Sequence, residues 1–202
     1  MQQPASVADQ PEADEPSSSA FPSIWTFIAI DCTSFGLFFA VFMWERMPHA
    51  ALFDASADQL DVRFGLANTL ILITSSYLIA LAVAAVRRGD LDDVRRKLGL
   101  GIAVGAAFAV LKVAEYSLKI AGGITPQTNA FFGYYFGLTG VHFVHYAAGM
   151  IVLAVMLGRA RRATTVDPGL AGLMISGGIF WHMVDLLWVF LFPMLYLLSR
   201  VQ

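Results

Sequence analysis

The sequence predicts an all-α protein, an integral membrane bundle of five transmembrane helices. Of its 202 residues, 57% are hydrophobic and 14% are charged, whereas about 25% of residues are charged in a typical soluble domain. A spanning helix needs about 20 apolar residues, because each residue rises ~1.5 Å and the hydrocarbon core is ~30 Å thick. Five stretches meet this requirement, at about residues 23–44, 66–86, 98–120, 131–158 and 171–198.

The segment before the first stretch has a different composition. Residues 1–22 contain four acids and four prolines but no Lys or Arg. Such a segment cannot bury enough apolar surface to offset its ordering entropy, so we expect a disordered acidic tail. It also lacks the basic start of a signal peptide, so the first span is expected to stay in the mature protein. Residues 23–198 are then expected to form one five-helix domain.

The basic residues predict the orientation of the bundle. Eight Lys and Arg lie in the connections at 87–97 and 159–170, whereas the opposite side carries only Arg46, Arg63 and Arg200. Cytoplasmic loops are enriched in Lys and Arg, so the N-terminus is predicted to be cytoplasmic and the C-terminus periplasmic. In a bacterium, this describes a multi-pass protein of the inner membrane.

Charge and cysteine usage argue against a nucleic-acid partner, a disulfide framework and a cysteine-based metal site. The net charge is −2 and basic clusters are scarce, which argues against a nucleic-acid partner. The single cysteine, Cys32, lies within the first span. A lone cysteine forms neither a disulfide framework nor a cysteine-based metal site.

Polar residues mark the first two spans. The first carries Asp31 near its middle and ends at Trp44 and Arg46, a typical interfacial anchor. The second contains Asn68 and several hydroxyl residues, among them Ser75. Small hydroxylated residues allow helix backbones to approach closely, so the second helix is predicted to pack inside the bundle.

The other three spans carry most of the ionisable groups. The third begins with glycines and alanines and ends with lysines around a glutamate, and the fourth opens with aromatic residues before its two histidines. The fifth contains a histidine and an aspartate, and Pro193 favours a kink in its last turns. Each intramembrane charge costs at least ~2.5–3.5 kcal/mol, so these groups should face the bundle interior and be paired. There are eight: Asp31, Lys112, Glu115, Lys119, His142, His145, His182 and Asp185.

Helical spacing suggests partners for these groups. Lys112 and Lys119 lie three and four residues from Glu115, on the same helix face. An internal Lys112–Glu115 ion pair is the favoured interpretation, and Lys119 is expected to reach the outer interface. Counted from the outer ends, the depths of Glu115 and His142 differ by only ~6 Å, which predicts a pair across the third and fourth helices.

The fifth span offers a pair of its own. His182 and Asp185 lie three residues apart. There the carboxylate could orient the imidazole or pair with a cation on another helix.

Asp31 has no cation within one turn of its own helix. Its partner must therefore lie on another helix, or the carboxyl stays protonated. Because burial favours the uncharged form, Asp31 is a candidate proton donor or acceptor. The alternative is a neutral acid bonded to Ser or Thr of the second span.

A self-contained metal or haem enzyme is the alternative of another class. Di-iron bundles use two Glu-x-x-His motifs and two further glutamates, whereas this chain has Lys-x-x-Glu, His-x-x-His and His-x-x-Asp. His142 and His145, three apart on one helix, cannot ligate opposite faces of one haem. A hydrogen-bonded structural network is therefore favoured over a metal centre.

Several segments resemble subunit III of the haem-copper oxidases. The string WHMVDLLWVFLFPMLYL is similar to the Trp-His-Phe-Val-Asp-x-x-Trp signature that ends this subunit. The stretch GYYFGLTGVHFVHYAAGMIVL resembles its Thr-Gly-x-His-x-x-His segment, and EYSLKI resembles its Glu-Tyr segment. The RRGD turn after the second span is also similar to this family. Asp31, before FGLFFAVF, stands where the family has a membrane-buried glutamate. The resemblance covers about residues 23–198.

Within this family, the chain resembles the short five-helix form. The segments MWERMPHAALF and LANTLILITSS look most like the NorE branch associated with nitric oxide reductase. Whether the complex reduces oxygen or nitric oxide is left open.

The resemblance also implies a role. It implies no haem, copper or other metal in this chain, bound phospholipid, and a catalytic subunit I that carries the haem and copper. The chain would then be a non-catalytic subunit that supports assembly, lipid binding and proton uptake. The residues that carry this role over are Asp31, Glu115, His142, His145, His182 and Asp185.

Overall fold

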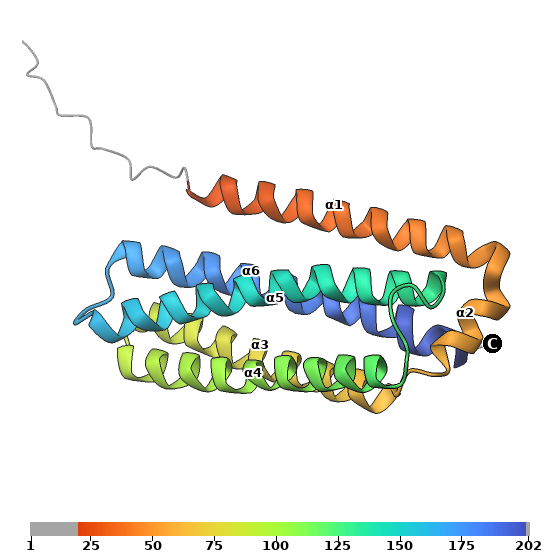
Figure 1. Ribbon diagram of the computed structural model, residues 1–202. Coiled ribbons are helices and arrows are strands. Elements are labelled where there is room, and N and C mark those ends of the chain that lie inside the picture. The colour runs from red at the N-terminus through yellow and green to blue at the C-terminus, as the bar shows by residue number, and fades with distance from the viewer. Residues whose placement is uncertain (1–19, 201–202) are drawn as a thin grey trace, which may run out of the picture.

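The computed structural model describes residues 20–200, which are helical with short connections and contain no strand. The long helices are α1 (Ala20–Arg46), α3 (Val62–Arg87), α4 (Leu91–Ala121), α5 (Ala130–Arg162) and α6 (Pro168–Phe192), and a short helix, α2 (Ala50–Ala57), follows α1 (Figure 1). Five helical segments are long and apolar enough to cross a membrane. The predicted fold class is therefore confirmed. Residues 1–19 of the predicted tail (1–22) lie outside the described residues. Residues 20–22 belong to helix α1, which begins at Ala20.

The helices extend beyond the apolar stretches at one end of the bundle. Helix α4 begins at Leu91 instead of residue 98, and α5 continues to Arg162 instead of ending at 158. Charged residues outside the hydrocarbon core can continue a helix, so hydropathy marks the depth of the membrane and not the helix ends.

Each helix from α3 to α6 begins at a side chain that caps it. The cap oxygens of Asp61, Asp90, Asn129 and Asp167 accept hydrogen bonds of 2.7–3.0 Å from backbone N–H groups two or three residues later. Asp and Asn are among the preferred N-caps, each worth ~1 kcal/mol. These polar residues thus define where the four helices begin.

Helices α3–α6 form a four-helix bundle in which α3 and α5 each pack against both α4 and α6. Helix α3 approaches α4 at Gly101, where a Cβ atom would lie 2.7 Å from Ile79 Cδ1. At the same crossing, Ser75 Oγ donates a 2.8 Å hydrogen bond to the Gly101 carbonyl. The predicted close packing of the second span is therefore confirmed on one face of α3, whereas Leu70 and Tyr77 on another face are exposed.

Helix α1 lies along the side of this bundle (Figure 1). Only 11% of the apolar stretch in Ile24–Ala57 is buried, against 33–56% in the other four spans. Its end near α2 is held by aromatic side chains: Phe42 packs on Phe53 with ring centroids 5.4 Å apart and on Tyr134 at 5.7 Å. Helix α1 is therefore the span with the largest surface available to lipid or a partner.

The chain changes its helical form at Pro193. Helix α6 ends at Phe192 and continues as a π-helical segment, η2 (Pro193–Leu197), followed by η3 (Leu198–Arg200). Proline lacks the N–H that an α-helix needs, so an irregularity is expected here. The π-helical segment carries Tyr196, which is fully buried.

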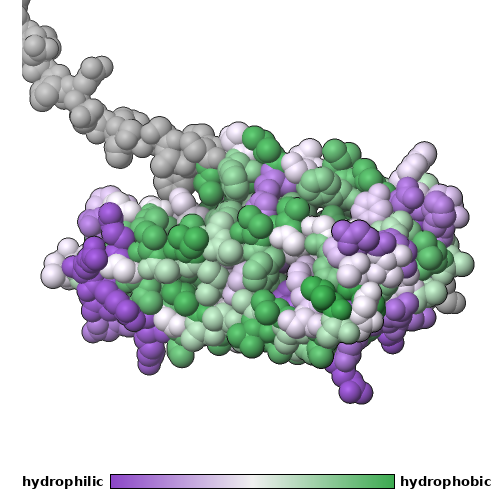
Figure 2. Space-filling model, viewed as in Figure 1, coloured by the Kyte–Doolittle hydropathy of each residue, from purple (hydrophilic) through white to green (hydrophobic). Residues whose placement is uncertain are grey.

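Side-chain polarity divides the surface into three zones. Figure 2 shows apolar side chains over the middle of the visible face and hydrophilic residues gathered at the two ends. We call the end where α3 meets α4 and α5 meets α6 the basic end. It carries Arg87, Arg88, Arg95, Arg96, Lys97, Arg159, Arg161 and Arg162.

Candidate functional site

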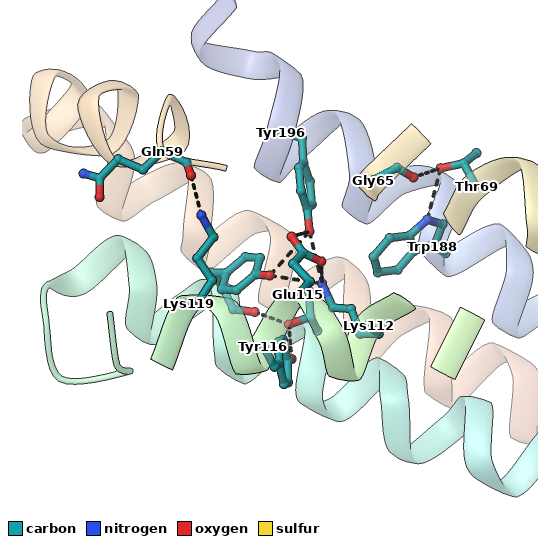
Figure 3. A network of polar contacts seen from close by, with 11 residues as sticks. Gln59, Gly65, Thr69, Lys112, Glu115, Tyr116, Lys119, Trp188 and Tyr196 are labelled. Atoms are coloured by element: carbon teal, nitrogen blue, oxygen red, sulfur yellow. Dashed lines mark hydrogen bonds and ion pairs between the residues drawn. The ribbon is translucent and has the colours of Figure 1, made fainter. Parts of the chain in front are cut away.

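A polar cluster lies inside the bundle around Lys112 (Figure 3). Lys112 Nζ donates hydrogen bonds to Glu115 Oε2 at 3.0 Å, to Tyr135 Oη at 3.2 Å and to Tyr196 Oη at 3.1 Å. Tyr196 Oη in turn donates to Glu115 Oε1 at 2.7 Å. We call these four residues the lysine cluster; their side chains are at most 2% exposed. They come from α4, α5 and η2, so the cluster joins three segments.

Aromatic rings surround the ammonium group of Lys112. Its Nζ lies 4.8 to 5.7 Å from the ring centroids of Tyr116, Tyr135, Trp188 and Tyr196. Aromatic faces attract a cation within about 6 Å. All three donor positions of the ammonium are also used by hydrogen bonds. The protein itself therefore supplies a partner for each donor position of the buried ammonium group.

The predicted Lys112–Glu115 ion pair is confirmed, but the predicted pair between Glu115 and His142 is wrong. Glu115 already has two partners, one a single turn away on its own helix and the other a tyrosine from η2. His142 instead packs against Trp188, with ring centroids 5.3 Å apart, and against Phe108 at 5.7 Å. Depth along two helices does not fix which way each helix is rotated, and that rotation separates the pair.

His142 is buried as an aromatic ring. It is 0% exposed, and neither ring nitrogen has a hydrogen-bond partner among the described residues. The side chain of Asn68 is equally buried and without a partner in the described part of the chain. His142 therefore contributes to the core through its ring contacts with Phe108 and Trp188.

Asp31 has a partner on another helix, as one of its two predicted arrangements required. Its Oδ1 lies 3.0 Å from His145 Nε2, and His145 Nδ1 lies 2.9 Å from the Val141 carbonyl oxygen. The carbonyl can only accept, so Nδ1 carries a hydrogen. The contact between Nε2 and Oδ1 then needs one further proton, held by either side chain. This pair can therefore exchange a proton within the contact between α1 and α5.

His182 and Asp185 lie beside α3. His182 Nδ1 is 2.5 Å from Ser76 Oγ, and the same hydroxyl interacts with Asp185. Ser76 is thus the polar partner from α3, so neither proposed arrangement of this pair describes the contacts. Asp185 Oδ1 is buried and has no partner among residues 20–200.

Lys119 lies at the end opposite the basic end. Its Nζ donates to the Gln59 carbonyl oxygen (Figure 3), as expected for a lysine reaching the interface. A cavity of about 230 Å³ next to it is lined by Asp61, Lys119 and Glu115, together with three apolar side chains. The lysine cluster therefore borders a cavity near this end of the bundle.

The polar side chains lie in separate places, the four-residue lysine cluster and smaller contacts, and not in one centre. Within residues 20–200, no group of three or more His, Cys, Asp or Glu side chains is placed to hold a metal ion. The contacts described above tie α1 to α5, α3 to α6, and α4 to α5 and η2. Their chemistry is that of helix association and local proton sharing.

Sequence reasoning missed the tyrosines and the serine that complete these contacts. Tyr135 and Tyr196 supply hydroxyls to the lysine cluster, and Ser76 binds His182. A signal was present, because buried tyrosine hydroxyls usually find a partner. Which charge each hydroxyl would meet depends on the packing of the helices.

Comparisons with known proteins agree with the architecture. A family model described as "Cytochrome c oxidase subunit III" matches residues 27–200. The "Cytochrome bo(3) ubiquinol oxidase subunit 3" of Pseudomonas aeruginosa is 27% identical over 194 residues, 96% of this chain and 91% of that protein. The "Cytochrome c oxidase subunit 3" of Corynebacterium diphtheriae is 35% identical over 144 residues, 71% of this chain and 69% of that protein.

A third relative is a quinol oxidase subunit. The "Quinol oxidase subunit 3" of Bacillus spizizenii is 26% identical over 178 residues, 87% of this chain and 85% of that protein. None of these three names mentions nitric oxide reductase, so the resemblance to the NorE branch stays a prediction.

Proposed function

The chain belongs to the cytochrome c oxidase subunit III family, and from this premise we propose that it is a non-catalytic subunit supporting a haem-copper catalytic subunit. It is a multi-pass protein of the bacterial inner membrane. The observation that carries the proposal is the family match, which covers the bundle from residue 27 to 200. The contacts of Lys112 with Glu115 and of Asp31 with His145 support it, because these charged side chains find their partners within the chain.

The first part of the proposed role is assembly. The lysine cluster holds α4, α5 and η2 together, and Ser75 and Ser76 hold α3 to α4 and α6. Interhelical hydrogen bonds and close packing drive helix association in lipid, where the hydrophobic effect between helices is absent. A rigid α3–α6 bundle would thus present a constant surface to the catalytic subunit.

The second part is lipid binding beside α1. One cavity of about 330 Å³ is lined by α1, α5 and α6, including Phe27, Val152 and Phe180. Another of about 380 Å³ lies between α1 and the α6–η2 junction, including Phe39 and Met194. Their almost wholly apolar walls match acyl chains, so we assign bound phospholipid to these two cavities.

The third part is proton handling by Asp31 and His145. The two side chains are 12% and 23% exposed, so they lie at the edge of the bundle. A carboxylate and an imidazole that share one proton can accept and release it without moving the helices. We assign to this pair a role in sustaining proton uptake by the catalytic subunit, which carries the haem and copper.

Purification from native membranes tests the proposal. An epitope-tagged chain solubilised in mild detergent should carry with it a catalytic subunit with haem and copper. Identifying that subunit also decides whether the complex reduces oxygen or nitric oxide. The NorE-like segments predict nitric oxide. Recovery of the chain without any haem-copper subunit, across several mild detergents, would contradict the proposal.

A further inference from the structure

A second apolar site lies on the α3–α6 face, away from the cavities beside α1. It is a groove of about 280 Å³ that opens on the surface of the bundle. Its walls are Ala80, Val83 and Ala84 of α3 and Ile175, Gly178 and Ile179 of α6. Three of these six side chains are alanine or glycine, which leaves a hollow between the two helices.

The groove runs along the helices from the basic end toward the membrane interior. Gly178 faces Val83, whose Cγ2 would lie 3.0 Å from an added Cβ, and His182 bonds to Ser76. The two helices are therefore antiparallel. Arg87 lies at the basic end of the groove and His182 at the deep end. The lining residues run from 80 to 87 on α3 and from 175 to 182 on α6, a rise of ~10 Å along each helix. A lipid acyl chain also runs from the membrane surface toward the interior, so the groove is aligned with one.

Arg87 stands out among the basic residues of the α3–α4 connection because it has no acidic partner. The other four bind Asp92 or Asp93 at 2.8 to 3.0 Å; they are Arg88, Arg95, Arg96 and Lys97. Arg87 lines the groove, is exposed, and makes no hydrogen bond or ion pair with any residue in the range 20–200. Its guanidinium is free to bind an external anion.

At the deep end of the groove, one ring nitrogen of His182 already has a partner within the protein. His182 Nδ1 is bonded to Ser76, and the walls between His182 and Arg87 are apolar. The occupant should therefore be apolar along ~10 Å and anionic only at the end near Arg87. A guanidinium matches the geometry of a phosphate, which it can bind through two parallel hydrogen bonds.

We propose that this groove holds one acyl chain of an anionic phospholipid whose phosphate binds Arg87. The inference rests on the membrane placement in the proposed function, but it uses none of the residues beside α1. The protein would then have two lipid sites, an apolar one beside α1 and one between α3 and α6 that selects anionic lipid.

The test compares the full complex in nanodiscs made from phosphatidylglycerol and phosphatidylcholine. Arg87→Gln should reduce the preference for retained phosphatidylglycerol about fivefold, since one Arg near an anionic surface is worth ~1 kcal/mol. Arg88→Gln is the matched control: it removes the same charge from the same connection, but Arg88 binds Asp93. It should leave the preference within twofold of the parent complex. Equal losses in both variants would indicate general surface charge and overturn the proposal.

A second variant tests the groove itself. Ala84→Leu keeps the charge and fills the hollow, so it should also abolish the preference while the complex keeps its thermal stability. Phosphatidylglycerol with a photoreactive acyl chain should crosslink to peptides of α3 and α6 in the parent complex. Crosslinks confined to α1 and α5 peptides would overturn this site and leave the proposed lipid site beside α1 intact.

Discussion

At the scale of single residues, Lys112 shows how the bundle accommodates a charge at membrane depth. Its ammonium has three hydrogen bonds and four aromatic neighbours, all from within the chain. The desolvation cost of such a pair is offset only when both partners are present and well bonded. The stability of the bundle is therefore sensitive to single changes here.

Glu115→Ala should lower the free energy of unfolding by about 3–5 kcal/mol, because it leaves Lys112 buried without its counter-charge. The double change Lys112→Met with Glu115→Leu should recover most of that loss, since it removes both charges and keeps the volume. Thermal unfolding of the purified complex measures both. The spectrum of the catalytic subunit should stay unchanged. A double variant as unstable as Glu115→Ala would show that the charge pair is not the cause.

Asp31→Asn should preserve assembly but impair sustained turnover of the complex. The asparagine amide can still donate to His145 Nε2, so the contact between α1 and α5 remains. It cannot exchange a proton, so activity should decline over many cycles. The control is Glu45→Gln, at the exposed end of α1 beside His49. Activity traces over many turnovers decide the matter, and normal turnover in Asp31→Asn would reduce Asp31 to a packing residue.

At the scale of the helices, close approach depends on where glycine faces a rigid neighbour. Gly149 of α5 lies against the indole of Trp181, where an added Cβ would be 2.8 Å from Cε3. Gly140 of the same helix has no atom within 4 Å of such a Cβ. The two positions form a matched pair.

Gly149→Ala should destabilise the contact between α5 and α6 by about 1–3 kcal/mol, the usual cost of overpacking. Gly140→Ala should be neutral or stabilising by up to ~1 kcal/mol, because alanine favours helix more than glycine does. Chemical or thermal unfolding of both variants in the same detergent measures the difference. Equal stability of the two variants would mean that α5 and α6 do not pack at Trp181.

The number of spanning helices could be predicted from the sequence, but several of their ends and side-chain partners could not. Hydropathy predicted five spans because a run of about twenty apolar residues matches the thickness of the hydrocarbon core. It missed the beginning of α4 at Leu91, since charged residues continue a helix beyond the membrane core. The partner of Glu115 could not be predicted either. Tyr196 reaches it from the π-helical segment after Pro193, and Lys112 from one turn away, whereas His142 is turned toward Trp188.

At the scale of the whole molecule, the basic end should face the cytoplasm, with the N-terminus on the same side. Thr164 lies exposed between α5 and α6 at this end, and Gln127 lies exposed between α4 and α5 at the other. In a Cys32→Ser chain, a membrane-impermeant thiol reagent added to spheroplasts should label Gln127→Cys and not Thr164→Cys. The reverse labelling pattern would show that the bundle has the opposite orientation in the membrane.

On the proposed function, this chain should carry no redox centre and should serve a subunit that does. Optical spectra and metal analysis of the intact complex and of the separated chain test it most directly. The complex should contain haem and copper, and the chain, once dissociated and still helical, should contain neither haem, copper nor iron. Stoichiometric haem or metal on the dissociated chain would contradict the account and favour a self-contained membrane enzyme.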